Sequence, residues 1–343
     1  MLVKAFDIQP NEIDLPAFPL YALMDTLLGV TSVIPDMRFP VPAKTDPRKV
    51  IESIRKFHVT NMFASPVVLD VLAKFGEGKN IKLPSLRRVI TAGAPASVRL
   101  QERFRRLLVD ETYLFGVYGA TEVLPIAVVE SRDIFDACEK TAIGAGVCLG
   151  IPVNGAMVRV IQITETPIEC WGEAVELSAN QIGEITVKGA AVTNEYLARP
   201  EANRQAKIQD GNDIVHRTGD AGYFDERGRL WYCGRKSHRV AASDGDVLFT
   251  EQIEGIFNTH SLVFRTALVG VRGKPVLWVE LEEGARHVNK DSIKRELIEI
   301  GKFHPQASKI EKFLFMKKFP TDVRHNSKII RERLAEFATR RFS

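Results

Sequence analysis

The sequence has few cysteines, no strong excess of one charge and no long uninterrupted apolar run. Its four cysteines are scattered, with no CxxC pair and no histidine at metal-ligand spacing. We therefore predict reduced thiols in a cytoplasmic protein instead of a disulfide framework. The net charge of +4 over 343 residues is mild, which argues against nucleic-acid and strong membrane-surface binding but would suit an anionic substrate.

The most apolar stretch, residues 15–35, is interrupted by three prolines and by Asp25, and acidic residues precede it. A signal peptide would need a basic start, and a transmembrane helix would need a longer unbroken run, so we expect neither. The pattern YALMDTLLG is helical and VTSVIP is a short β-branched run. We therefore expect a buried helix over residues 21–29 that leads into a short buried strand over residues 30–35.

The length of the chain suits two or three domains. From residue 46 onward, helical and strand-like patterns alternate, and Asp46-Pro47 provides the cap and the first turn of the first helix. We predict helices over residues 46–57, 66–75 and 96–108, and strands over residues 59–65, 86–93 and 113–119. Strands separated by helices predict an α/β fold, with a parallel sheet flanked by helices on both faces.

The character of the sequence then changes twice. Residues 149–234 contain strand-like pieces split by glycines and polar turns, which predicts a β-rich subdomain. Helical and strand-like patterns alternate again in residues 235–343, which end in a basic helix predicted over residues 326–342. We therefore predict an α/β part over residues 1–148, the β-rich subdomain, and a small C-terminal α+β domain over residues 235–343.

Two loops follow predicted parallel strands, the place where ligands bind in open α/β sheets. The small residues of Gly93-Ala94-Pro95 permit a close backbone approach to a flat ring. In Tyr118-Gly119-Ala120-Thr121-Glu122, the threonine hydroxyl can hydrogen-bond a phosphate oxygen, and the glutamate is a hard oxygen ligand suited to Mg²⁺. Taken alone, each segment is also compatible with a simple turn at the end of a strand, and for the segment around Gly93 a simple turn is the commoner case.

Residues 216–240 contain a second group of candidates. A polar turn from Asp225 to Gly228 predicts a hairpin between two aromatic, strand-like flanks. Just before it, Asp220 either closes the hairpin or accepts two hydrogen bonds from the hydroxyls of a ribose. Lys328, at the start of the final basic helix, is either a solvated surface lysine or a positive charge for a transferring phosphoryl group.

Five features, in this order and spacing, resemble the adenylate-forming superfamily of acyl-CoA synthetases, peptide-synthetase adenylation domains and luciferases: YGATE at 118–122, GEITVKG at 183–189, HRTGD at 216–220, GRLWYCGRK at 228–236 and the lysine at 328. The resemblance implies ATP or AMP and Mg²⁺ as cofactors, with the YGATE segment at the adenine, the α-phosphate and the metal. It implies that Asp220 holds the ribose, that Arg235 also touches the nucleotide and that Lys328 stabilises adenylation. It further implies that the C-terminal domain is mobile.

Longer stretches, from about residue 10 to the end, look like the β-lactone synthetases of bacterial long-chain olefin biosynthesis. That resemblance implies adenylation of a long-chain β-hydroxy fatty acid, whose own hydroxyl then closes a β-lactone, and it implies other olefin-biosynthesis enzymes as partners. One alternative is a fatty acyl-CoA ligase that uses a fatty acid and CoA. A second alternative is an inactive fragment that binds a nucleotide weakly or pairs with a separately encoded N-terminal piece.

The sequence also departs from the superfamily pattern. Residues 1–20 contain nothing like the family's phosphate-cradling loop, so we expect the chain to begin inside the catalytic domain and not to turn over ATP by itself. We also expect an exposed apolar patch at LPAFPLYAL, residues 15–23. Ser237 stands where family hinges often have Asp or Lys. The segment after it lacks the basic-x-x-Gly spacing that helps thioester-forming members accommodate CoA.

Overall fold

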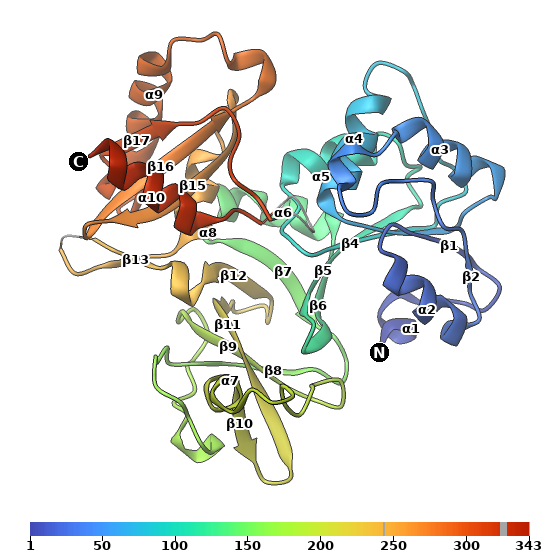
Figure 1. Cartoon of the computed structure of the whole chain (residues 1–343), viewed down its shortest axis with the longest axis horizontal. Helices are drawn as coiled ribbons and strands as arrows, with labels where there is room; N and C mark the ends of the chain where they lie inside the picture. Colours follow the sequence, from blue (N-terminus) through green and yellow to red (C-terminus); the bar gives the residue numbers. More distant parts are fainter. Residues whose placement is uncertain (243, 323–327, 343) are drawn as a thin grey trace. The chain divides into compact units, whose positions relative to one another are not determined.

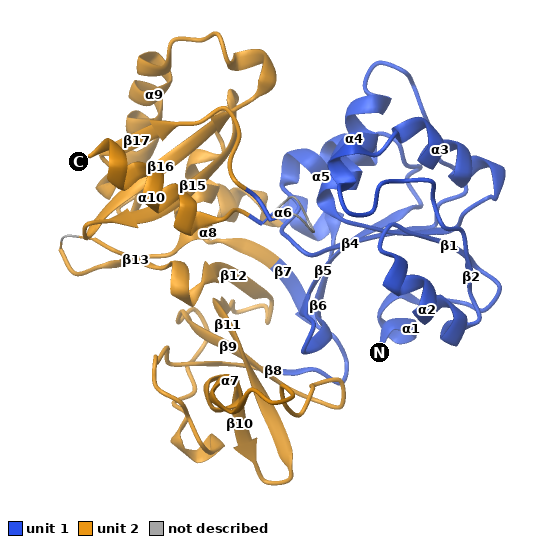
Figure 2. Cartoon of the chain, in the orientation of Figure 1, with its two compact units in different colours: residues 1–136, 149–157, 321–328 blue, residues 137–148, 158–320, 329–343 orange. Residues whose placement is uncertain are grey.

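The computed structural model describes residues 1–242, 244–322 and 328–342. These residues form two compact units, shown in blue and orange in Figure 2. Unit 1 contains Met1–Asp136, Leu149–Met157 and Thr321–Lys328, and unit 2 contains Ala137–Cys148, Val158–Pro320 and Ile329–Ser343. Each unit is described by itself. The domain boundaries at residues 148 and 234 stay a prediction.

Unit 1 is built around a sheet whose first five strands are parallel (Figure 1). Their order is β2 (Thr31–Ser32), β1 (Ile13–Pro16), β3 (Asn61–Ala64), β4 (Arg88–Ala92) and β5 (Tyr113–Ala120), and β6 (Val123–Glu130) then pairs antiparallel with β5. The intervening helices are α2 (Pro19–Leu28), α3 (Pro47–Lys56), α4 (Pro66–Gly76) and α5 (Val98–Arg105), and α1 (Leu2–Phe6) precedes β1. This arrangement confirms the predicted α/β fold with a parallel sheet.

Helix α3 shows why the sequence pattern was informative in this unit. The side chain of Asp46 accepts a hydrogen bond from the backbone N–H of Arg48, and Pro47 occupies the first turn. The apolar residues at helical spacing, Val50, Ile51 and Ile54, are all buried. They pack into a core shared with β1, β3, β4, α4 and α5, so local capping and tertiary burial favour the same helix.

The predicted buried helix exists as α2 (Pro19–Leu28), but the prediction that it is buried is wrong. Asp25 is its only buried residue, whereas the side chains of Leu20, Leu23 and Leu27 are exposed. Hydrophobicity alone misled the prediction, because these leucines recur at helical spacing on the outward face. Within the predicted apolar patch of residues 15–23, Leu20 and Leu23 are exposed, whereas Leu15 and Ala17 are buried. The strand that follows α2 is reduced to the two residues of β2, neither of them buried.

The first part of unit 2 is an antiparallel sheet of β12 (Leu230–Arg235), β11 (Asp213–Phe224), β9 (Gly183–Lys188) and β8 (Met157–Ile161), and β10 (Lys207–Asp210) also pairs with β11. Helix α7 (Pro200–Ala206) precedes β10. Boundaries between the units fall inside α6 (Ser131–Ala142), β7 (Val147–Pro152) and, after its first residue, β8. The strand-rich character of residues 156–235 agrees with the sequence pattern.

The second part of unit 2 contains the three-stranded sheet β15 (Val263–Val271), β16 (Lys274–Leu281) and β17 (Lys312–Phe315), together with α8 (Thr250–Phe257), α9 (Lys290–Lys302) and α10 (Arg331–Arg341). A short hairpin of β13 (Val240–Ala241) and β14 (Val247–Leu248) precedes α8. Trp278 of β16 and Phe257 of α8 are among the fully buried side chains of this second part. Within the described residues, no helix combines the length and the apolar character that a membrane crossing requires.

The prediction that Lys328 lies in the final helix is wrong. Helix α10 has Ile330 as its N-cap, so Lys328 precedes it. The Asp322 N–H donates to the carbonyl of Lys328 at 3.0 Å, and the Ile330 N–H donates to the carbonyl of Pro320 at 2.9 Å. These backbone hydrogen bonds compete with a helical conformation. Residues 326–327, the predicted start of the helix, lie outside the described residues.

Candidate active site

Two predicted segments lie at one edge of the unit 1 sheet. Strands β4 and β5 are parallel neighbours, and Ala92 at the end of β4 is paired with Val117 of β5. The turn Gly93-Ala94-Pro95 and the strand end Tyr118-Gly119-Ala120 therefore follow the same carboxyl edge. Gly93 has φ of 95°, in the region that favours glycine. The positive φ of the turn is a sufficient reason for a glycine at this position. The ring-binding role of Gly93, Ala94 and Pro95 therefore stays a prediction.

The YGATE segment differs from the predicted loop. Tyr118, Gly119 and Ala120 complete β5, and Ala120 pairs with Val123 of β6, so Thr121 and Glu122 form a two-residue hairpin turn. A Cβ atom on Gly119 would lie 2.5 Å from Cδ1 of Leu124 and 3.1 Å from the carbonyl oxygen of Val123, so a larger residue would require the Leu124 side chain to move. The sequence showed the parallel neighbour of β5, but the antiparallel partner that turns the loop into a hairpin was missed.

The turn places one hard oxygen ligand at the sheet edge. The described residues contain no group of three or more Asp, Glu, His or Cys side chains placed to hold a metal ion. Mg²⁺ is commonly bound by one or two carboxylates together with substrate phosphates. Glu122 therefore fits Mg²⁺ as one protein ligand beside the phosphates of a nucleotide, and Thr121 is exposed next to it.

The predicted hairpin of unit 2 is present, and Asp225 organises its turn. One carboxylate oxygen of Asp225 accepts from the backbone N–H groups of Arg227 and Arg229 at 3.0 and 2.9 Å. The other accepts from the indole N–H of Trp231 at 3.0 Å. Gly228 has φ of 72°, as the turn prediction requires. Asp220 is consequently not needed to close the hairpin.

Asp220 instead faces Arg235 across the β11–β12 ladder. The guanidinium of Arg235 donates from Nη1 to Oδ1 of Asp220 at 2.9 Å and to the carbonyl of Thr218 at 2.8 Å. The Asp220 side chain is mostly buried, while half of the Arg235 side-chain surface is exposed. The structure therefore brings together two of the predicted nucleotide-binding residues as one ion pair.

Lys328 is exposed, and its backbone N–H donates to the side chain of Asp322 at 3.1 Å. It belongs to unit 1 together with the YGATE turn, whereas the Asp220–Arg235 pair belongs to unit 2. The roles assigned to Lys328, Asp220, Arg235 and the YGATE segment stay predictions.

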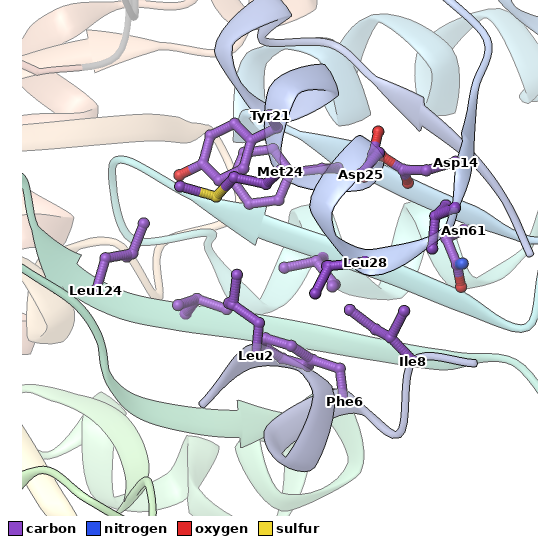
Figure 3. A pocket seen from close by; sticks show the side chains of 14 residues that line it. Leu2, Phe6, Ile8, Asp14, Tyr21, Met24, Asp25, Leu28, Asn61 and Leu124 are labelled. Carbon is purple, nitrogen blue, oxygen red and sulfur yellow. The ribbon is translucent and has the colours of Figure 1, made fainter. Parts of the chain in front are cut away.

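Sequence reasoning missed an apolar pocket in unit 1 (Figure 3). Its wall includes Val117 of β5 and Leu124 of β6, which flank the YGATE segment in the sequence. Tyr21, Met24 and Leu28 of α2 contribute the inner face of that helix. The remaining wall is Leu2, Phe6, Ile8, Asp14, Asp25, Val30, Asn61, Phe63 and Ile90. A mostly apolar wall with a few polar groups is typical of a small-molecule site.

The pocket wall contains a buried pair of carboxyl groups, Asp14 of β1 and Asp25 of α2. Both residues are 7% exposed, and their side chains share a hydrogen bond. Burial and, to a smaller extent, the neighbouring charge of Asp25 together raise the pKa of Asp14 to about 8. Burial also raises the pKa of Asp25, whose carboxylate accepts from the Ser32 hydroxyl at 2.5 Å. At neutral pH the pair therefore retains a proton.

Comparison with known proteins decides the family. The model of the AMP-binding enzyme family matches residues 18–197, more than half of the chain. The chain belongs to this family. The match begins in α2, which forms part of the pocket, and it includes the β4–β5 edge and the YGATE turn. The resemblance to adenylate-forming enzymes drawn from the sequence is thereby confirmed.

Two relatives are olefin β-lactone synthetases. The one from Xanthomonas campestris is 45% identical over 98% of this chain, and the one from Stenotrophomonas maltophilia is 43% identical over 99%. The chain spans 62% of the length of each. A long-chain-fatty-acid–CoA ligase of Thermus thermophilus is more distant, with 27% identity over 79% of this chain and 48% of its own length.

The fold is also that of solved structures. The o-succinylbenzoate coenzyme A synthetase of Bacillus subtilis, in complex with AMP, superposes with a TM-score of 0.74 at 21% identity over 97% of this chain and 62% of its own length. Identity this low supports the fold alone. The predicted adenylate-forming architecture, an α/β sheet followed by a small C-terminal α+β part, is confirmed. The predicted free thiols agree with the structure, in which all four cysteines are free.

Proposed function

We propose that the chain takes part in the ATP-dependent, AMP-forming activation of a long-chain β-hydroxy fatty acid, followed by closure to a β-lactone. The observation that carries this proposal is the family match, which includes the YGATE turn at the carboxyl edge of the sheet. The apolar pocket has a cavity volume of about 50 Å³, which has room for a small apolar group only, and the names of the two olefin β-lactone synthetases reported above supply the lactone. Reduced cysteines support a cytoplasmic location.

In unit 1 we assign the adenine to Gly93-Ala94-Pro95 and Tyr118-Gly119-Ala120, and a phosphate oxygen to Thr121. In unit 2 we assign the ribose hydroxyls to Asp220, because a carboxylate accepts two hydrogen bonds, and we assign a second nucleotide contact to Arg235. Mg²⁺, when bound by Glu122, would neutralise phosphate charge.

The proposed chemistry has two steps. A carboxylate oxygen of the acid attacks the α-phosphorus of ATP, the bond to pyrophosphate breaks, and acyl-AMP forms. The β-hydroxyl oxygen then attacks the acyl carbon, the bond from that carbon to AMP breaks, and the hydroxyl proton leaves to give β-lactone and AMP. Lys328 and Thr121 would stabilise the charge that develops at the α-phosphate during the first step.

Product analysis tests this function. The assay is run on residues 1–343 and on a fusion with the segment of the Xanthomonas relative that this chain does not match. With ATP, Mg²⁺ and a long-chain 3-hydroxy acid, we expect mass spectrometry to show AMP, pyrophosphate and β-lactone from the fusion. Adding CoA should not divert the product. A CoA thioester as the main product would favour the fatty acyl-CoA ligase, and no AMP from either protein would reject the proposal.

Replacing Asp220 by alanine should weaken AMP binding, because the ribose would lose a charge-assisted acceptor. We expect a loss of about 1.5–3 kcal/mol in binding free energy, measured by calorimetry. Asp210→Ala is a matched control, since Asp210 forms an ion pair with Lys188 in the same sheet. Equal AMP affinity of Asp220→Ala and the parent would contradict the ribose assignment.

A further inference from the structure

A buried ion cluster lies beside the Asp220–Arg235 pair in unit 2. Glu184 of β9 and Arg217 of β11 have side chains that are each 1% exposed. Arg217 donates to Oε2 of Glu184 from Nη2 at 2.6 Å and from Nε at 3.1 Å. The ammonium of Lys236 donates to the same oxygen at 3.0 Å. One buried carboxylate oxygen therefore accepts hydrogen bonds from two cations.

This cluster brackets the two proposed nucleotide residues in the sequence. Arg217 lies three residues before Asp220 on β11, and Lys236 directly follows Arg235, the last residue of β12. Asp220 and Arg235 are themselves partners in the β11–β12 ladder. The cluster thus ties together the chain segments from which both side chains emerge.

The backbone hydrogen bonds between strands are interrupted on both sides of the Asp220–Arg235 pair. The ladder between β9 and β11 is irregular between Arg217 and Ala221, where Gly219 has φ of 71°. Beyond Arg235 the chain leaves β12 and enters a short 3-10 turn, Lys236–His238. Side-chain bonds compensate for the irregular ladder, since Thr218 donates to the carbonyl of Ile185 at 2.8 Å and Lys236 donates to the carbonyl of Thr164 at 3.2 Å.

The two cations of the cluster have different roles. Arg217 also donates to the carbonyls of Thr164 and Thr166 at 2.8 and 2.9 Å. It therefore provides hydrogen bonds both to the buried carboxylate of Glu184 and to the loop that contains these two threonines. If Lys236 were removed, Glu184 would still be paired with Arg217, so no buried charge would be left alone. What would be lost is the tether that joins the residue after Arg235 to β9.

We propose that Lys236 is a positioning residue for nucleotide binding: its bond to Glu184 fixes the end of β12 and so holds the Arg235 guanidinium opposite Asp220. Lys236 acts through Arg235 and does not touch the nucleotide. The inference rests on the proposed function, in which Asp220 and Arg235 bind the nucleotide.

The test uses Lys236→Met, which keeps the aliphatic stem and removes the charge, and Lys236→Arg, which restores a donor. Lys188→Met is the matched control, because Lys188 of β9 forms ion pairs with Asp210 and Asp213 at 2.9 Å in the same sheet. Amide hydrogen exchange of residues 216–222 and 230–236 is measured without ligand. AMP affinity is measured by calorimetry on the same full chains.

We expect Lys236→Met to weaken AMP binding about threefold to tenfold and to speed amide exchange in both segments. Lys188→Met should do neither, and Lys236→Arg should recover most of the affinity. Unchanged exchange in Lys236→Met, or unchanged AMP affinity beside a parent that binds AMP, would overturn the proposal. If exchange rises but the parent binds no AMP, Lys236 positions Arg235 as proposed, and the nucleotide role of the pair is what fails.

Discussion

Replacing Lys328 by alanine in an active fusion should lower the rate of adenylation by about 100-fold to 1,000-fold, the effect of losing one preorganised charge contact in a transition state. Lys328 is exposed and precedes α10, and the backbone hydrogen bonds from Asp322 to Lys328 and from Ile330 to Pro320 keep this segment out of the helix. A flexible ammonium group on such a segment can provide a point charge at the α-phosphate. The rate is measured as pyrophosphate release at saturating ATP and acid.

Substrate binding should change much less than the rate, because the contact forms chiefly in the transition state. Lys302→Ala is the matched control, since Lys302 is another exposed lysine of the C-terminal part, paired with Glu299 at 2.6 Å. A parent-like rate in Lys328→Ala would identify Lys328 as an ordinary surface residue. A large rise in KM at unchanged kcat would assign it to ground-state binding instead.

The sequence predicted the elements in which local and tertiary signals agree. In α3, the cap at Asp46 and the buried stripe of Val50, Ile51 and Ile54 favour the same helix. In the β11–β12 hairpin, the turn from Asp225 to Gly228 forms as predicted and sets Asp220 opposite Arg235. The register shifts between Ala221 and Gly222, so the turn predicts the hairpin, while the exact partner of Asp220 becomes visible only in the structure.

Other features depend on contacts between segments distant in sequence. The hairpin between β5 and β6 was missed because a strand pattern does not reveal which neighbour it pairs with. The orientation of α2 was wrong because both of its faces carry apolar residues, and only the packed structure shows which face borders the pocket. The carboxyl pair was missed for the same reason, since Asp14 and Asp25 belong to different elements.

Site roles are harder still to predict than positions. Thr121, Glu122 and Asp220 are each weak candidates when taken alone, and the combined order of the motifs makes the family recognisable; the role of Arg235 is implied by that resemblance. Glu184 and Lys236 lie in the segments GEITVKG and GRLWYCGRK, but their ion pair could not be predicted, because it becomes visible only when the strands are assembled. The residues that hold a site in place are therefore less predictable than those that contact the ligand.

Replacing Asp14 by asparagine should make the protein more stable at pH 8 than the parent, by an amount on the order of a few kcal/mol in the free energy of unfolding. The folded state raises the pKa of Asp14 from 3.8 to about 8. Between these values the folded state keeps a proton that the unfolded state has released. The stability that Asp14 contributes is therefore fully present below pH 3.8 and is lost as the pH rises to about 8.

Asparagine removes this dependence and keeps the contact, because its amide can donate to Asp25 in place of the carboxyl proton. Glu12, the other acid that raises the pKa of Asp14, has partners of its own, Arg88 at 2.5 Å and Asn61 at 2.9 Å. Chemical denaturation at pH 4, 6 and 8 measures the effect, and the advantage of Asp14→Asn should grow with pH. Asp36→Asn, at an exposed residue, should keep the parent's pH profile, and Asp25→Asn provides a second way to remove the shared proton. If Asp14→Asn and Asp25→Asn both follow the parent's profile from pH 4 to pH 8, the two carboxyl groups do not share a buried proton.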